Sequence, residues 1–330
     1  MRAIALLSGG LDSALAIKLV RNQGVDVMAL NFTSPFCTCS PKAGGCHMAT
    51  AVAQELGVEL RMMSKGLEYL KIVEKPKHGH GRGMNPCIDC RIFMLRKAAK
   101  LMAEEGFSFV ITGEVLGQRP MSQHRQAIDL IERESGLPGL ILRPLSAQHF
   151  APTIPEANGW VDRSKLLAIE GRSRKVQYEV AAREGVEKFG CPAGGCLLTD
   201  ENIARRVRDM FEYVADYTMH DASLLRVGRH LRLHKGLKVI IGRDADECRR
   251  LEAAGPSYGR LEIVDFPGPV LLTRGEPADA DFPRLGALLR FFAKKAVGDA
   301  VTVAWTQGET TKTFSVADIA AMAEVDAMRI

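Results

Sequence analysis

The sequence predicts an α/β protein in which a parallel β-sheet with covering helices is followed by a smaller α+β domain. Strand-like apolar runs alternate with amphipathic helical runs through the first part of the chain, a pattern typical of parallel sheets. Near residue 218 this alternation stops, and short strand-like runs with one helix follow. We therefore expect one domain over residues 1–217 and a second over residues 218–330.

The elements of the first domain follow from the periodicity of its apolar residues. Strand-like runs cover residues 2–7, 25–32, 58–62, 107–112 and 140–142. Helical runs cover residues 12–23, 47–56, 91–105, 160–190 and 199–217. Ligands of parallel sheets bind at the carboxyl ends of the strands, so we expect functional residues near Ser8, Asn31 and Thr112.

Composition and charge narrow the class of protein. The chain of 330 residues is 46% hydrophobic, yet no run of 18 apolar residues occurs, so we expect no membrane span. It begins directly with a strand, which predicts no signal peptide, and its eight cysteines then indicate a reducing cytoplasm. Residues 61–100 hold ten Lys or Arg against three Asp or Glu. Such a patch suits a polyanionic partner, with a solvated helix face as the alternative.

A loop rich in glycine and serine joins the first strand to the first helix. It reads Ser8-Gly9-Gly10-Leu11-Asp12-Ser13. Backbone amides, two hydroxyls and a helix N-terminus attract phosphate, and glycines let the backbone approach it closely. The loop has neither the Gly-Lys-Ser/Thr ending of a Walker A site nor a dinucleotide fingerprint. The simpler interpretation is a tight turn in which Ser8 or Asp12 caps the helix.

Three groups of cysteines suggest sulfur or metal chemistry. Cys87 and Cys90 precede the basic helix at 91–105, where the helix N-terminus and nearby cations (Arg91, Arg96 and Lys97) favour thiolates. A second pair, Cys191 and Cys196, lies in a loop before the helix at 199–217. A structural zinc site that joins these two pairs is the alternative.

The third group lies after the second strand. It comprises Cys37, Cys39, Cys46 and His47, which match the number and type of ligands in a tetrahedral zinc site. For these residues a zinc site is at least as good an interpretation as catalysis. Cys248 stands alone on a charged stretch, and we expect it to be structural or incidental.

Two of these motifs resemble those of known enzymes. The loop 8–13 resembles the SGGxDS signature of the N-type PP-loop ATP pyrophosphatases. Residues 85–91 and 195–197 (Asn-Pro-Cys-Ile-Asp-Cys-Arg and Gly-Cys-Leu) are similar to the reactive-cysteine segments of tRNA thiolation enzymes, the tRNA 2-thiouridylases and 4-thiouridine synthetase-like proteins. The resemblance covers roughly residues 1–215. It implies an adenine nucleotide alpha hydrolase-like fold and ATP-dependent tRNA thiolation, in which a uridine carbonyl oxygen is adenylated, pyrophosphate leaves and sulfur replaces the oxygen.

The resemblance also implies roles for individual residues. ATP phosphates would lie on Ser8, Gly9, Gly10, Asp12 and Ser13, and Asp12 would help to hold Mg²⁺. Adenosine would lie near Asn31, Phe32 and Gly113, and Arg143 would face a phosphate. Cys90 and Cys196 would carry and release persulfide sulfur; alternatively, Cys87, Cys90 and Cys196 would hold a [4Fe–4S] cluster. Cys87 and Cys191 are less well defined than the other two, and both schemes stay open.

The second domain resembles the RNA-binding domain of the NFACT family. The resemblance rests on residues 227–233 and 239–243 (VGRHLRL and VIIGR) and on the later PGPVLL strand and the helix after it. Arg229, Arg232, Lys235 and Lys238 are expected on one strand face against phosphates, with a solvated sheet edge as the alternative. The expected partners are tRNA and a sulfur donor, either a cysteine desulfurase or sulfide; the oligomeric state is not predicted.

Two rival functions account for part of the sequence. A PP-loop ligase that forms an amide or nitrile on a small molecule explains residues 8–13 but leaves the cysteine pairs without a role. A non-catalytic RNA-binding protein with a vestigial nucleotide fold is opposed by the complete SGGLDS loop.

Overall fold

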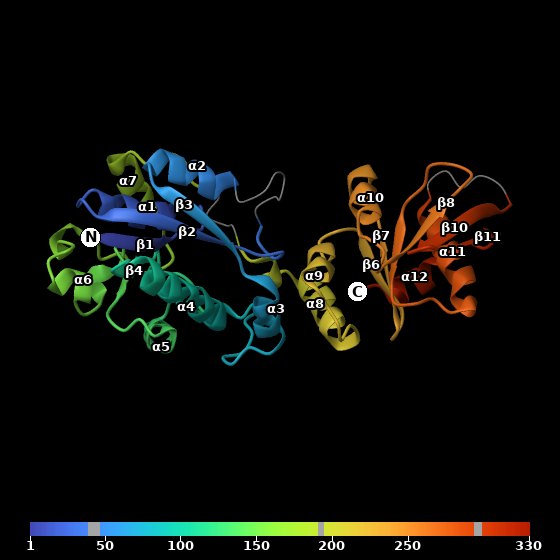
Figure 1. Cartoon of the computed structure of the whole chain (residues 1–330), viewed down its shortest axis with the longest axis horizontal. Helices are drawn as coiled ribbons and strands as arrows, with labels where there is room; N and C mark the ends of the chain where they lie inside the picture. The colour runs from blue at the N-terminus through green and yellow to red at the C-terminus, as the bar shows by residue number, and fades with distance from the viewer. Residues whose placement is uncertain (39–46, 191–194, 294–298) are drawn as a thin grey trace. The chain divides into compact units, whose positions relative to one another are not determined.

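The computed structural model describes residues 1–38, 47–190, 195–293 and 299–330. The chain forms two compact units, unit 1 (Met1–Thr199) and unit 2 (Asp200–Ile330), which are shown in Figure 1. The sequence predicted the boundary near residue 218, but the division lies earlier, before helix α8 (Glu201–Tyr213). Ion pairs between α8 and the sheet of unit 2, described below, are the physical reason.

Unit 1 contains the predicted parallel sheet. In order across the sheet, its strands are β3 (Glu59–Ser64), β2 (Asp26–Thr33), β1 (Arg2–Leu6), β4 (Phe109–Ile111) and β5 (Ile141–Leu142), all parallel. The helices are α1 (Leu11–Arg21), α2 (His47–Leu56), α3 (Gly66–Glu74), α4 (Cys87–Glu105), α5 (Arg125–Ser135), α6 (Ile154–Ala157) and α7 (Lys175–Glu184). The α/β prediction is therefore confirmed.

Helices cover both faces of this sheet because side chains alternate along the buried strands. Ala3 and Ala5 of β1 pack into the core formed with α1, α2 and α7, whereas Ile4 and Leu6 pack into the core formed with α4 and α5. Figure 1 shows the two helical layers on either side of the sheet. The sheet is thus buried on both faces, and its strand ends are left for ligands.

Two predicted helices of unit 1 differ from the structure, and others were not predicted. The helix expected at 160–190 is shorter than predicted: it consists of α7, and the short 3-10 turn η2 (Arg163–Lys165) precedes it. The reason is that Gly171 has a φ of +87°, which a right-handed helix cannot contain. The helix expected at 91–105 begins earlier, at Cys87, so the cysteine pair lies within its first turns. Helices α3, α5 and α6 were not predicted. Two further 3-10 turns are η1 (Ala147–His149) and η3 (Leu197–Thr199).

Unit 2 is built on an antiparallel sheet. In order across the sheet, its strands are β11 (Thr310–Val316), β10 (Val301–Gln307), β8 (Gly259–Ile263), β9 (Leu271–Arg274), β7 (Leu237–Ile241) and β6 (Arg229–His234). Besides α8, the helices are α9 (Met219–Leu224), α10 (Ala245–Glu252), α11 (Phe282–Phe292) and α12 (Met322–Met328), with the 3-10 turn η4 (Asp279–Asp281). The α+β class is confirmed. Of the helices of unit 2, the sequence predicted α8, which it assigned to the first domain, and the helix after the PGPVLL strand, which corresponds to α11.

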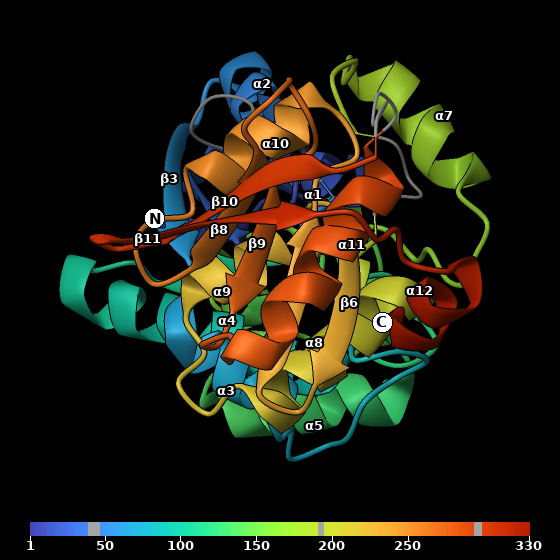
Figure 2. The ribbon, with the colours of Figure 1, turned by 90° about the vertical axis from the view of Figure 1, so that its right-hand side faces the viewer.

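The sheet of unit 2 also has a core on each face. Val239 and Ile241 pack with α11 and α12 on the face that Figure 2 shows toward the viewer. Ile240 and Leu272 pack on the opposite face with residues of α9 and α10. Within the described residues, no helix of either unit combines the length and apolar character that crossing a bilayer requires.

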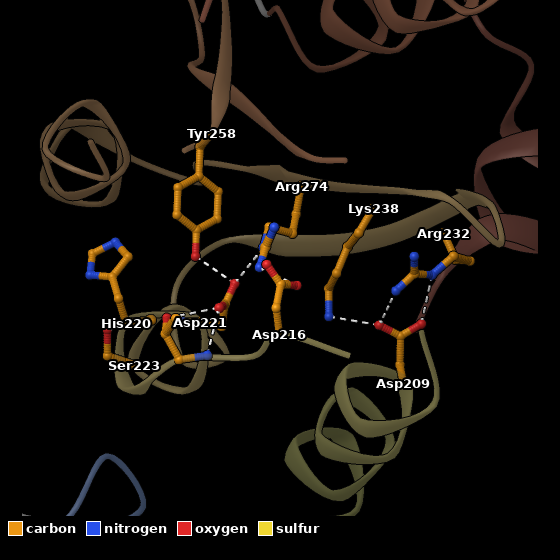
Figure 3. A network of polar contacts seen from close by, with 10 residues as sticks. Asp209, Asp216, His220, Asp221, Ser223, Arg232, Lys238, Tyr258 and Arg274 are labelled. Carbon is orange, nitrogen blue, oxygen red and sulfur yellow. Dashed lines mark hydrogen bonds and ion pairs between the residues drawn. The ribbon is translucent and has the colours of Figure 1, made fainter. Parts of the chain in front are cut away.

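A buried carboxylate joins α8 to this sheet. Asp209 of α8 accepts hydrogen bonds from Arg232 Nε and Nη2 at 2.9 and 2.7 Å and from Lys238 Nζ at 2.8 Å (Figure 3). Burial alone would raise the pKa of Asp209, but the hydrogen bond from Arg232 and the charge of Lys238 hold it below its ordinary value. Arg232 and Lys238 face each other on β6 and β7. The sequence placed both on a phosphate-binding face, whereas the structure commits both to Asp209.

A second carboxylate joins α9 to the same face of the sheet. Asp221 accepts hydrogen bonds from the Tyr258 hydroxyl at 2.6 Å and from Arg274 Nε at 2.9 Å (Figure 3). Its other oxygen accepts from the amide and hydroxyl of Thr218, which caps α9. The two carboxylates explain why residues 200–224 belong with unit 2.

We expect Asp209→Ala to lower the free energy of unfolding of unit 2 by about 3–5 kcal/mol, because it leaves the Lys238 ammonium buried without a carboxylate. Trp305, one of the two tryptophans in the chain, lies in unit 2 and reports on this transition once Trp160 is replaced by Phe. Urea unfolding followed by Trp305 fluorescence measures the effect. The control is Asp216→Ala, whose side chain is 80% exposed; an equal loss in this control would contradict the prediction.

Candidate functional site

The candidate site lies where the strand order of unit 1 reverses. From β1 the chain adds β2 and β3 on one side and then returns to add β4 and β5 on the other. Connections that leave neighbouring strands in opposite directions make this switch point the usual ligand site of an open α/β sheet. The loop 8–13 follows β1, and Thr112 and Gly113 follow β4, so the predicted phosphate and nucleotide residues meet there.

The loop 8–13 is held by its own hydroxyls. Ser13 Oγ donates to the Gly10 carbonyl at 2.9 Å and lies 3.1 Å from Ser8 Oγ. Gly9 has a φ of +78°, and a Cβ there would lie 2.9 Å from the backbone nitrogen of Ala49 in α2. Gly10 precedes α1, and no described side chain caps that helix. The cap by Ser8 or Asp12 that the simpler interpretation expected is therefore not formed, and phosphate binding by this turn stays a prediction.

Gly113 packs directly against this loop. A Cβ at Gly113 would lie 2.6 Å from the backbone carbonyl of Asp12 and from the amide nitrogen of Ser13. The sequence attributed this glycine to close approach of a nucleotide. The structure gives it a further reason: only glycine lets the end of β4 contact the first turn of α1.

Asp12 is the acidic residue of the loop. Its Oδ2 accepts a hydrogen bond from Gln118 Nε2 at 3.1 Å and lies 3.8 Å from Arg174 Nε. Burial raises the pKa of Asp12 in spite of these two partners. Its Oδ1 is buried and has no hydrogen-bond partner among the described residues. A hard cation such as Mg²⁺ fits an unpartnered carboxylate oxygen of this kind.

The other predicted nucleotide residues have varied surroundings. Asn31 is buried and donates to the Leu7 carbonyl at 2.7 Å, and its Oδ1 has no partner among the described residues. Phe32 packs at the margin of the α4 core. Arg143 is 4% exposed and pairs with Glu114 at 3.2 Å and Glu132 at 2.7 Å. Contacts of these three residues with ATP stay predictions, and the charge of Arg143 already has two carboxylate partners.

The cysteine pair lies at the start of α4. Cys87 Sγ accepts from Asn85 Nδ2 at 3.2 Å, and Cys90 Sγ accepts from Lys65 Nζ at 3.0 Å. The cations that the sequence predicted here have other partners: Arg91 pairs with Glu114, Arg96 bonds the Glu134 carbonyl and Lys97 pairs with Glu68. Sequence reasoning missed Lys65, although its place directly after β3 puts it at the ligand-binding edge of the sheet.

Cys196 belongs to the same cluster of thiols. Tyr69 of α3 is fully buried, and burial raises its pKa well above the ordinary value. The charges of Cys90, Cys196 and Cys87 and a hydrogen bond with Cys90 raise this pKa further. Burial also raises the pKa of Cys196 to about 12, with Cys90 and Cys37 as further contributors. The structure thus brings together three predicted thiols and adds Cys37, which pairs with Cys196 in an antiparallel bridge.

Part of the cysteine predictions lies outside the described residues. Cys39, Cys46 and Cys191 belong to the undescribed segments 39–46 and 191–194, so the zinc set of Cys37, Cys39, Cys46 and His47 stays a prediction. Within the described ranges, no three His, Cys, Asp or Glu side chains lie close enough to hold a single metal ion.

Two protein families match separate parts of the chain. Residues 1–150 match the family described as thiamine biosynthesis protein (ThiI), and residues 228–326 match the NFACT protein RNA binding domain. A probable tRNA sulfurtransferase of Finegoldia magna is 34% identical over 147 residues, which are 44% of this chain and 36% of that protein. One from Methanosarcina mazei is 31% identical over 124 residues, 36% of this chain and 29% of that protein.

Among solved structures, a 4-thiouridine synthetase–RNA complex with bound ATP is similar at 23% identity and a TM-score of 0.38, covering 68% of this chain and 52% of that one. The match spans about a third of the length of the two curated relatives. The predicted resemblance to PP-loop tRNA thiolation enzymes, followed by an NFACT-type domain, is confirmed by the two family matches and the sulfurtransferase relatives.

We expect Gly113→Ala to lower the free energy of unfolding of unit 1 by about 1–3 kcal/mol, because the added methyl group overlaps the Asp12–Ser13 backbone. Urea unfolding followed by Trp160 fluorescence, in a chain with Trp305 replaced by Phe, measures the loss. Gly10→Ala is the control, since a Cβ there meets only Ser8 Oγ at 3.5 Å. Equal losses of unfolding free energy in the two variants would contradict the prediction, because the close contact at Gly113 would then add no cost of its own.

The raised pKa of Cys196 predicts slow alkylation of the metal-free protein. A thiol with a pKa of about 12 is protonated at pH 8, so iodoacetamide should modify Cys196 at least roughly a hundredfold more slowly than in guanidinium-unfolded chains. The rate should keep rising as the pH increases from 8 to 11, where an ordinary thiol levels off. Peptide mass spectrometry measures it, and a plateau near pH 9 would contradict the prediction.

Proposed function

We propose that the protein thiolates a uridine of tRNA in two steps and uses ATP for the first. The observation that carries this proposal is that the phosphate loop and the thiols gather at one edge of one sheet. Ser8 follows β1, Cys37 lies beyond the end of β2, Lys65 follows β3 and Gly113 follows β4. The charge of Arg119 interacts with both Asp12 and Cys87. An intermediate activated on the loop would therefore form beside the sulfur-bearing residues.

In the first step a uridine carbonyl oxygen attacks the α-phosphorus of ATP. The new O–P bond replaces the bond between the α- and β-phosphates, and pyrophosphate leaves. The loop amides and the hydroxyls of Ser8 and Ser13 would hold the phosphates. Asp12, with its buried and unpartnered Oδ1, would hold Mg²⁺, which when bound offsets charge on the departing pyrophosphate. The uridine has to leave its base stack to reach this site.

In the second step sulfur replaces the activated oxygen and AMP leaves. The sulfur is either the terminal atom of a persulfide on Cys90 or Cys196, or a sulfide supplied by an Fe–S cluster held by Cys87, Cys90 and Cys196. Three cysteine thiols that share one buried tyrosine are a suitable set of donors for such a cluster. Asn85 and Lys65 would orient Cys87 and Cys90 in either scheme.

Unit 2 would bind the body of the tRNA. The family match over residues 228–326 supports this role. Because Arg232 and Lys238 are paired with Asp209, the phosphate contacts are assigned to exposed cations, among them Arg205 and Arg208 of α8 and Lys235 between β6 and β7.

The proposal is tested under anaerobic conditions with the purified protein, ATP, Mg²⁺, unmodified tRNA and a dithiol reductant. The sulfur source is a cysteine desulfurase with cysteine in one assay, which can form the persulfide, and sulfide in a second assay, which can load a cluster. We expect AMP and pyrophosphate in a one-to-one ratio with thiouridine, which mass spectrometry of digested tRNA detects. Pyrophosphate that forms on a small molecule without tRNA would favour an amide- or nitrile-forming ligase. Binding of tRNA without any ATP cleavage would favour the non-catalytic RNA-binding protein.

Two variants separate the steps. Asp12→Asn should lower pyrophosphate formation at least roughly a hundredfold, because the loop loses the charge that holds the cation. Cys196→Ser should abolish thiouridine while tRNA-dependent pyrophosphate formation continues. Asp216→Asn, on the exposed surface of unit 2, is the control. Normal thiouridine formation by the Asp12→Asn variant would overturn the proposed role of the loop. Iron and sulfide analysis of anaerobic protein distinguishes the cluster from the persulfide.

A further inference from the structure

Cys37 lies directly opposite Cys196. The two residues form an antiparallel bridge, and the Leu197 amide donates to the Phe36 carbonyl at 2.8 Å. This hydrogen bond makes Cys37 and Cys196 a non-hydrogen-bonded pair, in which the Cα atoms are about 4.5 Å apart and the side chains leave the same face. Disulfides form across Cα separations of about 4.4–6.8 Å. The backbone therefore places these two thiols at a distance that a disulfide can span.

Both segments of this pair are anchored in the core of unit 1. Phe36 and Leu198 are fully buried, and the Leu198 carbonyl accepts from the Met84 amide at 2.8 Å. Cys37 Sγ lies 3.5 Å from Ser34 Oγ. Cys196 interacts electrostatically with Cys90 as well as with Cys37. Cys196 thus has one thiol neighbour on α4 and another on the segment after β2.

We propose that Cys37 is the resolving thiol of sulfur transfer at Cys196. This inference rests on the proposed function in its persulfide form. The terminal sulfur of a Cys196 persulfide anion attacks the adenylated carbon of uridine, the carbon–oxygen bond breaks and AMP leaves with its electron pair. Cys196 and the nucleotide are then joined through a disulfide.

The thiolate of Cys37 next attacks Cys196 Sγ. The sulfur–sulfur bond to the nucleotide breaks, the thiouridine leaves with the electron pair and a Cys37–Cys196 disulfide forms. A dithiol reductant restores the two thiols and is itself oxidised to a disulfide. Cys196 can then take the next sulfane sulfur from the persulfide of a cysteine desulfurase, whose own cysteine is left as a thiol.

The structure favours Cys37 over Cys90 for this role. Among the described residues, the backbone bridge to Cys196 is made by Cys37, whereas Cys90 lies on helix α4. Cys90 Sγ is also engaged by Lys65 at 3.0 Å. This arrangement suits Cys90 for receiving or passing on sulfur. Cys37, which faces Cys196 across the bridge, is then the thiol that releases the product.

The test is a single turnover of the persulfurated full chain with ATP and tRNA and without reductant. In the wild-type protein we expect thiolated tRNA and a Cys37–Cys196 disulfide, identified by peptide mass spectrometry. In Cys37→Ser we expect tRNA to stay attached to Cys196 and free thiolated tRNA to fall roughly tenfold or more. Added dithiothreitol should release this tRNA in thiolated form, which a misfolded variant could not reproduce. Cys248→Ser, which removes a free thiol of unit 2, is the control.

Two results would overturn the inference while leaving tRNA thiolation intact. One is a Cys90–Cys196 disulfide in the wild-type protein; the other is a Cys37→Ser variant that turns over like Cys248→Ser. Loss of bound iron in Cys37→Ser, with no disulfide in the wild type, would likewise overturn it by making Cys37 a cluster ligand. Absence of thiolated tRNA in the wild-type protein would instead refute the proposed function and this inference with it.

Discussion

The contact between Gly113 and the Asp12–Ser13 backbone is the constraint on which the candidate site depends. It fixes the end of β4 against the first turn of α1 with no room for a side chain. The next residue, Glu114, is fully buried and pairs with Arg91 at 3.4 Å and with Arg143 at 3.2 Å. Arg91 follows Cys90 in α4, so one continuous set of contacts connects the phosphate loop with the thiols.

The ion pairs of the Glu114 carboxylate with Arg91 and Arg143 stabilise this set of contacts. Burial acts to raise the pKa of Glu114, but the charges of Arg91 and Arg143 outweigh it and hold the pKa below the ordinary value. Removing one guanidinium partner of a buried carboxylate strongly destabilises the folded protein. Arg91 and Arg143 therefore serve to position α4 and β5 around the switch point. Both cations thus have a carboxylate partner that the sequence did not predict, and a contact of Arg143 with a phosphate stays a prediction.

Features set by local pattern could be predicted from the sequence, and features set by distant pairing could not. The strand β1 and the loop 8–13 follow from apolar alternation and from glycine and serine chemistry, which act within a few residues. Lys65 reaches Cys90 only because β3 ends beside β2 and α3 then turns toward α4. Cys37 was grouped with Cys39 and Cys46 because they are neighbours in the chain. Its partner Cys196 lies far along the sequence, and no local pattern connects the two.

The same distinction changes how the basic character of unit 2 should be interpreted. Residues 220–243 contain six Lys or Arg and only one acidic residue, Asp221, which suggested a basic strand face. Yet Asp209, from a helix assigned to the other domain, neutralises part of that charge on the inside of the unit. A count of charges along a segment ignores carboxylates that tertiary packing brings from elsewhere. For a nucleic-acid surface only exposed cations count, because a phosphate cannot displace a buried carboxylate that already makes three charged hydrogen bonds.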